Sequence, residues 1–203
     1  MNAKILRAAF NAAIRAGLLE TNPAGSLQLP DAISEERAPF TPGEIETLLK
    51  ATKGSDWQTA TMLAAFAGLR LGDAVSLKWD NVDLAAGTIK FVPQKTSRKG
   101  KELTIPISDR LLAHLDKLAG TAAAQKSPFV CPKLAGCEIG GRAGLSAEFI
   151  EVMGKAHVGS DSITAKDGRS RKFSRKTFHS LRHAFVSRLA NAGVAEDALP
   201  LPG

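Results

Sequence analysis

Thr177-Phe178-His179-Ser180-Leu181-Arg182-His183 is the most informative motif of this chain. Thr177 belongs to the residue types that cap helix N-termini, and the apolar spacing after it predicts a helix from Phe178 to Ala192. Gly193 follows, where a helix C-terminus favours glycine. The motif therefore occupies the first two turns of a predicted helix.

This predicted helix has two different faces. The side chains of the apolar face are Phe178, Leu181, Phe185 and Leu189. His179, Arg182 and His183 fall on the neighbouring face, one turn apart. An imidazole beside a guanidinium suits a bound phosphate. The alternative is a surface helix with a solvated polar face, and sequence further upstream decides between the two.

The composition favours a polyanionic partner. The 203 residues include 27 Lys+Arg and 20 Asp+Glu, which gives a net charge of +7 and a pI near 9.6. Such a charge favours nucleic acid or an anionic membrane. No apolar run approaches the roughly 20 residues of a membrane span, so we expect no membrane partner. Two cysteines are too few for a disulfide scaffold and indicate a reducing compartment.

The chain divides into a short N-terminal segment and a larger domain. An amphipathic helix is predicted within residues 1–19, and Asn22-Pro23-Ala24-Gly25 ends it. We predict helix plus linker over residues 1–35 and one domain over 36–203. A lone amphipathic helix has no core, so it either packs on the larger domain or is the remnant of an upstream domain. It lacks a signal-peptide apolar block, and a mitochondrial presequence is the alternative.

The larger domain is predicted to be α+β and mainly α. Thr41-Pro42-Gly43-Glu44 has the pattern of a capped helix start. Further helices are predicted over residues 57–66, 74–79, 109–118 and 145–156. Alternating residues over 88–92 and 103–107, with a short strand near Val82, predict one small antiparallel sheet near residues 82–108. Lys95 to Lys101 lies in its basic hairpin, residues 120–144 form a loop, and residues 160–176 are polar.

Three motifs in order identify a resemblance. Gly68-Leu69-Arg70-Leu71-Gly72-Asp73 places Arg70 in a tight loop, where Asp73 supports it or a nearby histidine. Lys95 follows in the hairpin, and then His179-x-x-Arg182-His183. From about Phe40 to Gly193 the chain resembles the tyrosine recombinase (phage integrase) family, which carries a G-L-R-x-x-[ED] loop, a hairpin lysine and an H-x-L-R-H helix.

The resemblance implies the DNA breaking-rejoining catalytic fold and a set of site residues. Residues 1–30 look like the last helix and linker of the family's upstream core-binding domain. Arg70 and Arg182 are the expected clamps on the scissile phosphate, because guanidiniums bind phosphate oxygens bidentately and stay charged. Lys95 would protonate the leaving 5′ oxygen, and His179 would act as acid/base or phosphate donor. His183 is expected to support the site rather than to react. No metal or other cofactor is needed, since the arginines supply the positive charge.

Basic side chains outside the motifs are candidates for DNA contact. A run of them leads into the motif helix, and in most proteins such a run is only a solvated loop. The expected DNA-binding residues are Arg98, Lys99, Lys101, Arg169, Arg171, Lys172, Arg175 and Lys176. A zinc site at Cys131 and Cys137 with His114 or His157 is the other alternative, but the five-residue spacing fits no usual zinc knuckle.

The family's nucleophile is missing from this sequence. The family uses a tyrosine on a later helix after a Gly-His or Gly-Trp motif, whereas the chain has no tyrosine and closes with Pro200-Leu201-Pro202-Gly203. We interpret it as an incomplete copy, truncated before that helix. Without a tyrosine it forms no phosphotyrosyl intermediate unless a neighbouring protomer donates one.

Two functions from different classes remain open. The first is site-specific DNA recombination or integration by strand transfer. The second is a non-catalytic DNA-binding protein that keeps the integrase fold and phosphate pocket. Double-stranded DNA and other integrase protomers are the expected partners. The expected location is the cytoplasm of a bacterium or its phage, in association with the nucleoid.

Overall fold

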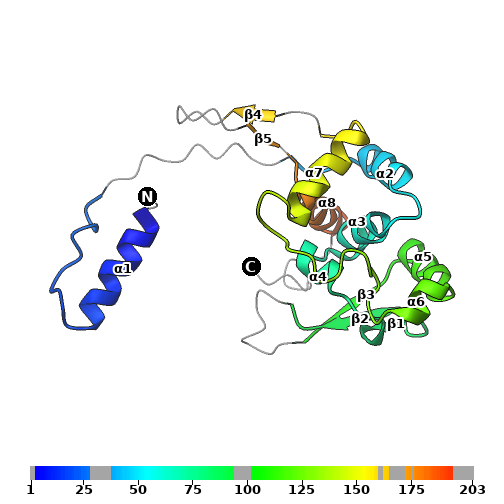
Figure 1. Cartoon of the computed structure of the whole chain (residues 1–203), viewed down its shortest axis with the longest axis horizontal. Coiled ribbons are helices and arrows are strands. Elements are labelled where there is room, and N and C mark those ends of the chain that lie inside the picture. The colour runs from blue at the N-terminus through cyan, green and yellow to red at the C-terminus, as the bar shows by residue number, and fades with distance from the viewer. Residues whose placement is uncertain are drawn as a thin grey trace. The chain divides into compact units, whose positions relative to one another are not determined.

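A computed structural model describes residues 3–27, 38–93, 102–159, 162–164, 172–174 and 176–193. The chain divides into two units, Met1–Glu36 and Arg37–Gly203, each of which is described here by itself (Figure 1). Assignment of the first unit to a core-binding domain stays a prediction. The elements are α1 (Ala3–Arg15), α2 (Pro42–Ala51), α3 (Asp56–Ala67), α4 (Leu71–Val75), η1 (Trp79–Asn81), β1 (Val82–Asp83), β2 (Thr88–Phe91), β3 (Leu103–Pro106), α5 (Asp109–Ala119), α6 (Ala122–Lys126), α7 (Leu145–Lys155), β4 (Ser162–Thr164), β5 (Lys172–Ser174) and α8 (Phe178–Asn191).

In the first unit a turn folds back along α1. The Arg7 side chain donates to the carbonyl of Ala24 at 2.9 Å, and Asn22 donates to the carbonyl of Arg7 at 3.1 Å. Ala24 is buried, whereas Ile5 and Leu18 are largely exposed. The described part of this unit, residues 3–27, is therefore one helix and a turn joined by polar contacts, with apolar side chains still in contact with solvent.

Helix α3 is the centre of the second unit. Nine of its twelve residues are buried, so it is apolar on every side rather than along one stripe. It packs against α2, α4, α5 and α8 (Figure 1). Trp57 of α3, Phe149 of α7 and Phe178 of α8 form an aromatic cluster with ring centroids 5.0–6.4 Å apart. These tilted and edge-on contacts attach both later helices to the central one.

The predicted helix starts are present. Glu44 N donates to Thr41 Oγ1 at 3.3 Å, and Thr41 N donates to Glu44 Oε2 at 2.8 Å, so α2 begins with a capping box. Thr177 is the N-cap of α8, in extended conformation, and its N–H donates to Ser180 Oγ at 3.1 Å. Gly193 follows α8 with a φ of +79°.

The three-stranded sheet has the order β1-β2-β3 and is antiparallel throughout. Ile89 of β2 lies opposite Ile105 of β3, and both are buried on the face that meets the core. The sheet lies at the opposite end of the unit from α2 and α7 (Figure 1). The predicted fold class, mainly helical with a small antiparallel sheet near residues 82–108, is confirmed.

Three local predictions need correction. The loop expected over residues 120–144 contains the short helix α6. The short helix expected over residues 74–79 instead occupies Leu71–Val75. After a turn at Ser76, Leu77 and Lys78 are extended, and the 3-10 helix η1 begins at Trp79. The reason is tertiary, because Lys78 forms a β-bridge with Phe129 and the Val130 N–H donates to the Leu77 carbonyl at 2.9 Å. In addition, the polar stretch over 160–176 contains a second, two-stranded sheet, β4-β5.

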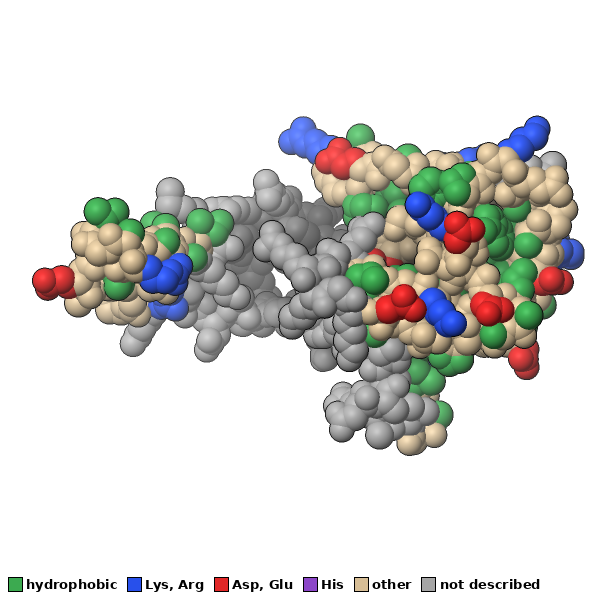
Figure 2. Space-filling view, turned by 90° about the horizontal axis from the view of Figure 1, so that it is seen from below, with side chains coloured by type: hydrophobic (Ala, Val, Ile, Leu, Met, Phe, Trp, Pro, Cys, Tyr) green, Lys and Arg blue, Asp and Glu red, His purple; other side chains and the backbone are tan. Residues whose placement is uncertain are grey.

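The surface is mixed in charge where Figure 2 shows it. Lys and Arg side chains lie beside Asp and Glu side chains on that face, with apolar patches between them. That face is therefore not a continuous basic surface. Within the described part of the chain, no helix is long and apolar enough to cross a membrane.

Candidate active site

The Arg70 loop begins at the end of α3. Gly68 ends that helix in the left-handed conformation, with φ +69°, and its N–H donates to the Ala64 carbonyl at 3.1 Å. A Cβ at this position would lie 2.6 Å from Phe185 Cδ1 of α8. Only glycine avoids both the left-handed strain and this clash. Close packing of α8 against this turn therefore fixes the position of the backbone at Arg70, which is the N-cap of α4.

Arg182 joins the motif helix to the same turn. Its guanidinium donates to the Gly68 carbonyl, two residues before Arg70. Burial is the largest influence on the pKa of Arg182, followed by the positive charge of Arg70, and together they lower it to about 10, against an opposing effect of Asp73. Arg182, Arg70 and Asp73 thus lie close enough to interact electrostatically. Arg182 stays charged at neutral pH.

A pocket of about 630 Å³ lies in front of these residues. Three helix beginnings contribute to it: the turn into α4, the first turn of α7 and the first turn of α8. The lining residues are Arg70, Leu71, Gly72, Asp73, Ile139, Ser146, Ile150, Thr177, Phe178 and His179. One part of the wall carries charged and polar groups, and another part, made by Ile139 and Ile150, is apolar.

The two histidines of the motif lie one turn apart on α8. Their ring centroids are 4.6 Å apart and the rings are nearly perpendicular, at 86°. Both side chains are exposed, and His179 lines the pocket whereas His183 is the next residue along the same face. An exposed imidazole at the mouth of a pocket is able to exchange protons with a bound group.

The structure brings together some of the predicted site residues. Arg70, Asp73 and His179 share the pocket, and Arg182 lies beside Arg70. The predicted residues Lys95, Arg98, Lys99, Lys101, Arg169, Arg171 and Arg175 lie outside the described residues, and of Lys172 only its backbone place in β5 is described. Lys176 forms an ion pair with Glu44.

Sequence reasoning missed the contribution of α7 and the loop before it. Ser146, Ile150 and Ile139 line the pocket, although no motif marks them. On α7 the core stripe is Leu145, Phe149 and Met153, and Ile150 stands next to it with 43% of its surface exposed. From periodicity alone Ile150 is indistinguishable from a core residue. No sequence signal identified this wall.

The two cysteines play different structural parts. Cys131 is buried, its thiol is 3.8 Å from the Asp56 carbonyl oxygen, and burial raises the pKa of that thiol. Cys137 is exposed. Among the described residues no group of three or more His, Cys, Asp or Glu side chains is placed to hold a metal ion. The alternative zinc site therefore receives no support from these residues.

The family model described as "Phage integrase family" matches residues 39–200. A match over most of the chain shows the family, so this chain belongs to the phage integrase family, and the resemblance drawn from its motifs is confirmed. Site-specific DNA recombination is accordingly the class of function to which the chain is assigned. No curated protein matches the chain.

Solved structures show the same fold. The chain is similar to the Tn1549 transposon integrase in complex with a circular intermediate DNA, at 19% identity and a TM-score of 0.67, over 97% of this chain and 68% of that one. It is similar to a lambda integrase dimer bound to a COC′ core site, at 20% identity and a TM-score of 0.65, over 97% of this chain and 53% of that one. The integrase of mycobacterium phage Brujita is 21% identical, with a TM-score of 0.53, over 95% and 58%.

Proposed function

We propose that the second unit binds a phosphodiester of duplex DNA in the pocket and serves DNA strand transfer there. The proposal rests on one observation. Arg70, from the turn after α3, and His179, from the start of α8, line the same pocket, and Arg182 lies beside Arg70. Opening a phosphodiester develops negative charge on the non-bridging oxygens. Two fixed guanidiniums stabilise that charge without any proton movement.

Each pocket residue has a distinct part in this chemistry. Arg70 and Arg182 clamp the phosphate, and Asp73 balances their mutual repulsion. His179 donates to a phosphate oxygen or exchanges a proton with it. His183 supports His179 by ring contact. Lys95, in the segment that joins β2 to β3, is proposed from the sequence motif to protonate the leaving 5′ oxygen.

The proposed partner is double-stranded DNA. The Tn1549 and lambda integrases were solved as complexes with DNA, and two lambda structures are dimers. In this chain the excess positive charge is concentrated in residues 94–101 and 165–175, which contain only one acidic residue, Asp167. Two such segments favour contact with phosphate backbones, and other integrase protomers are proposed as further partners. The protein would act in the cytoplasm, in association with the nucleoid.

The nucleophile of strand transfer has to come from elsewhere. In this chemistry a tyrosine oxygen attacks the phosphorus, a 3′-phosphotyrosyl bond forms, and the departing 5′ oxygen takes a proton. The 203 residues contain no tyrosine. A second candidate function is therefore a non-catalytic DNA-binding protein that occupies integrase sites. The two candidates differ in whether a tyrosine supplied by another protomer forms an adduct at this pocket.

A complementation experiment tests the proposal. The purified chain is mixed with an intact integrase that carries the tyrosine but lacks its own arginine at the position matching Arg70, on a nicked suicide DNA duplex. We expect no covalent adduct from this chain alone, and an adduct that survives denaturant in the mixture. The Arg70→Ala version should fail to complement, because half of the phosphate clamp is gone.

Two results would contradict the proposal in different ways. An adduct from this chain alone would show that another side chain acts as the nucleophile. Complementation that persists in an Arg70→Ala, Arg182→Ala double variant would show that the pocket is not where the phosphate reacts. DNA binding without complementation would favour the non-catalytic candidate.

A further inference from the structure

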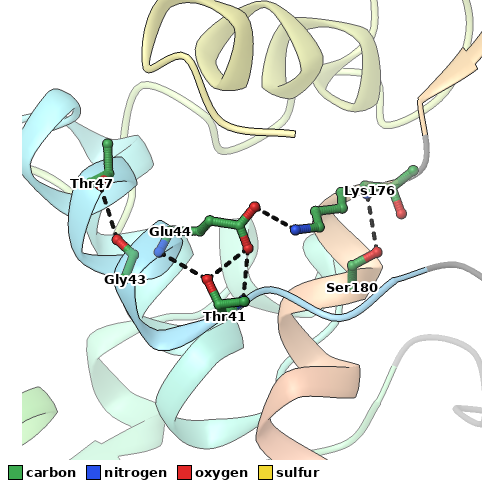
Figure 3. A network of polar contacts seen from close by, with 7 residues as sticks. Thr41, Gly43, Glu44, Thr47, Lys176 and Ser180 are labelled. Carbon is green, nitrogen blue, oxygen red and sulfur yellow. Dashed lines mark hydrogen bonds and ion pairs between the residues drawn. The ribbon is translucent and has the colours of Figure 1, made fainter. Parts of the chain in front are cut away.

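Lys176 stands directly before the motif helix and is turned into the protein rather than toward solvent. Its ammonium forms an ion pair with Glu44 at the start of α2 (Figure 3). The side chain of Lys176 is only 13% exposed, and that of Glu44 is 26% exposed. The pair joins two segments that are 132 residues apart in the sequence. Such a partly buried pair is screened by salt much less than a surface pair is.

The carboxylate that receives Lys176 is itself held in place. Glu44 Oε2 accepts hydrogen bonds from Thr41 N at 2.8 Å and from Thr41 Oγ1 at 2.9 Å, which leaves Oε1 for Lys176 (Figure 3). Burial pushes the pKa of Glu44 upward, but the bonds from Lys176 and Thr41 outweigh it, and the net pKa is lowered. Glu44 is therefore ionised at neutral pH.

The stem of Lys176 is fixed as well as its tip. The ammonium lies 5.5 Å from the centroid of the Phe40 ring. A Cβ built on Gly159 would lie 3.4 Å from Lys176 Cβ and 3.5 Å from its Cδ, so the stem passes closely over the backbone after α7. Gly159 has a φ of +68°, which also favours glycine there. Lys176 thus connects the beginning of α2, the end of α7 and the beginning of α8.

The first turn of α8 comes immediately after Lys176. Thr177 N donates to Ser180 Oγ, Ser180 is fully buried, and Phe178 enters the aromatic cluster. His179 lies between these anchored residues and lines the pocket. We propose that Glu44 and Lys176 are positioning residues, whose ion pair sets the place of this turn and through it the place of the His179 imidazole at the pocket. This inference rests on the proposed function.

Two other parts for Lys176 make different predictions. If Lys176 contacts DNA, as the sequence suggested, the protein should bind DNA more tightly when Glu44 is neutralised, because the ammonium would be released for phosphate. If the ion pair only stabilises the fold, its removal should change the unfolding free energy and leave the position of His179 unchanged. Positioning predicts that removing either partner displaces His179 and that the two removals have the same effect.

The first measurement needs no DNA. The chain has four histidines, so the imidazole signals are readily assigned by NMR. We compare the wild type with Glu44→Gln, Lys176→Met and, as the matched control, Glu46→Gln, which removes an ion pair from the same helix to Arg110 of α5. Glu44→Gln and Lys176→Met should shift the His179 signal and weaken its contact with His183, while His114 and His157 stay unchanged. Glu46→Gln should shift none of them.

The second measurement uses the complementation assay with these same variants, at a temperature where all are folded. We expect adduct yield to fall about tenfold or more for Glu44→Gln and for Lys176→Met, because a displaced catalytic group loses its alignment. The salt dependence of duplex binding should stay at its wild-type slope in both. A gain of DNA affinity in Glu44→Gln would assign Lys176 to phosphate contact and overturn the inference.

The outcomes separate this inference from the proposed function. An unchanged His179 signal in both variants overturns the positioning role, whatever the complementation assay gives. If the wild type itself does not complement, the proposed function fails, while the NMR comparison still decides whether the ion pair places His179.

Discussion

At the scale of single residues, Arg182 shows how the site is built. Its guanidinium is partly buried, which disfavours a charge, yet it lies beside Arg70 and donates to the Gly68 carbonyl. Its hydrogen bond to Gly68 and the charge of Asp73 stabilise the cation there, and an anion bound in the pocket would stabilise it further.

Replacement of Arg182 by lysine should keep the charge and lose the function. Lysine lacks the planar fork that reaches a carbonyl and a phosphate together. We expect Arg182→Lys to lower adduct yield in the complementation assay about a hundredfold, with duplex binding at low salt much less affected. Wild-type yield from the lysine variant would contradict a bidentate clamp at this position.

Gly68 is the residue on which the site turn depends. Gly68→Ala would incur left-handed strain and a contact with Phe185, and we expect a loss of about 3 kcal/mol in unfolding free energy. Gly87→Ala is the matched control, since Gly87 has a φ of +62° with open space around it. That variant should lose only about 1 kcal/mol. Urea unfolding measures both, and equal losses would show that the Phe185 contact does not matter.

At the scale of helices and strands, the aromatic cluster places α7 and α8 on α3. Phe149 is fully buried and contacts both Trp57 and Phe178. Trp57 Nε1 also donates to Glu148 Oε1 of α7 at 2.8 Å. The aromatic cluster therefore packs both α7 and α8 against α3. A change in this cluster should displace the pocket residues of both helices.

Truncation of Phe149 tests this attachment. We expect Phe149→Ala to lower the unfolding free energy by about 4 kcal/mol, and Phe149→Leu by about 1 kcal/mol, because leucine fills most of the cavity. In conditions where both variants are folded, Phe149→Ala should also weaken duplex binding. Wild-type duplex binding by the folded alanine variant would show that α7 does not shape the pocket.

The start of α2 gives a pH dependence whose sign is fixed. The pKa of Glu44 in the folded state lies below its ordinary value of 4.5, so Glu44 adds stability above that pH. This stability is lost as the pH falls through the folded-state pKa. The difference in unfolding free energy between wild type and Glu44→Gln should therefore be largest near pH 7 and shrink toward pH 3.

Glu46→Gln is the control for this pH series. The pKa of Glu46 is also lowered, first of all by its hydrogen bond from Arg110, so its effect has the same sign. The Glu46–Arg110 pair is exposed, with side-chain exposures of 49% for Arg110 and 44% for Glu46. The change in its stability effect with pH should therefore be smaller than for Glu44. An amplitude for Glu46 as large as that for Glu44 would contradict a special role for the Lys176 contact.

At the scale of the whole molecule, charge is distributed unevenly along the sequence. The net charge is +7, yet the face in Figure 2 mixes acidic and basic side chains. Residues 94–101 and 165–175 carry the excess. We therefore expect long-range attraction of DNA to depend on these two short segments.

Neutralising one of these segments should change the salt dependence of DNA binding. With Lys95, Arg98, Lys99 and Lys101 replaced by glutamine, the slope of log K against log salt should become shallower by about 0.9 for each phosphate that the protein no longer neutralises. The control replaces four exposed lysines outside the two segments by glutamine, which removes the same total charge: Lys50, Lys53, Lys117 and Lys126. Fluorescence anisotropy with a duplex measures both, and equal slopes in the two quadruple variants would show that only net charge matters.

Most of the helices and strands of the second unit could be predicted from sequence patterns. The Thr41–Glu44 capping box, the apolar helix around Met62, the alternation around Ile89 and the helix that begins at Phe178 all arise from interactions within a few residues. The order of the three motifs also identified the family. Backbone preference and apolar period act over short distances, so they can be read without knowledge of the fold.

The groups that surround the motif residues could not be predicted, because they depend on how distant segments pack. Contacts with Phe129 and Val130 moved the short helix to Leu71–Val75. Cross-strand pairing formed β4-β5 in a polar stretch where each strand has a single apolar residue, Ile163 or Phe173. The apolar wall of the pocket and the partner of Lys176 likewise come from distant segments. Packing brings such segments together through the shapes of whole helices, and no short pattern in the sequence encodes which surfaces will meet.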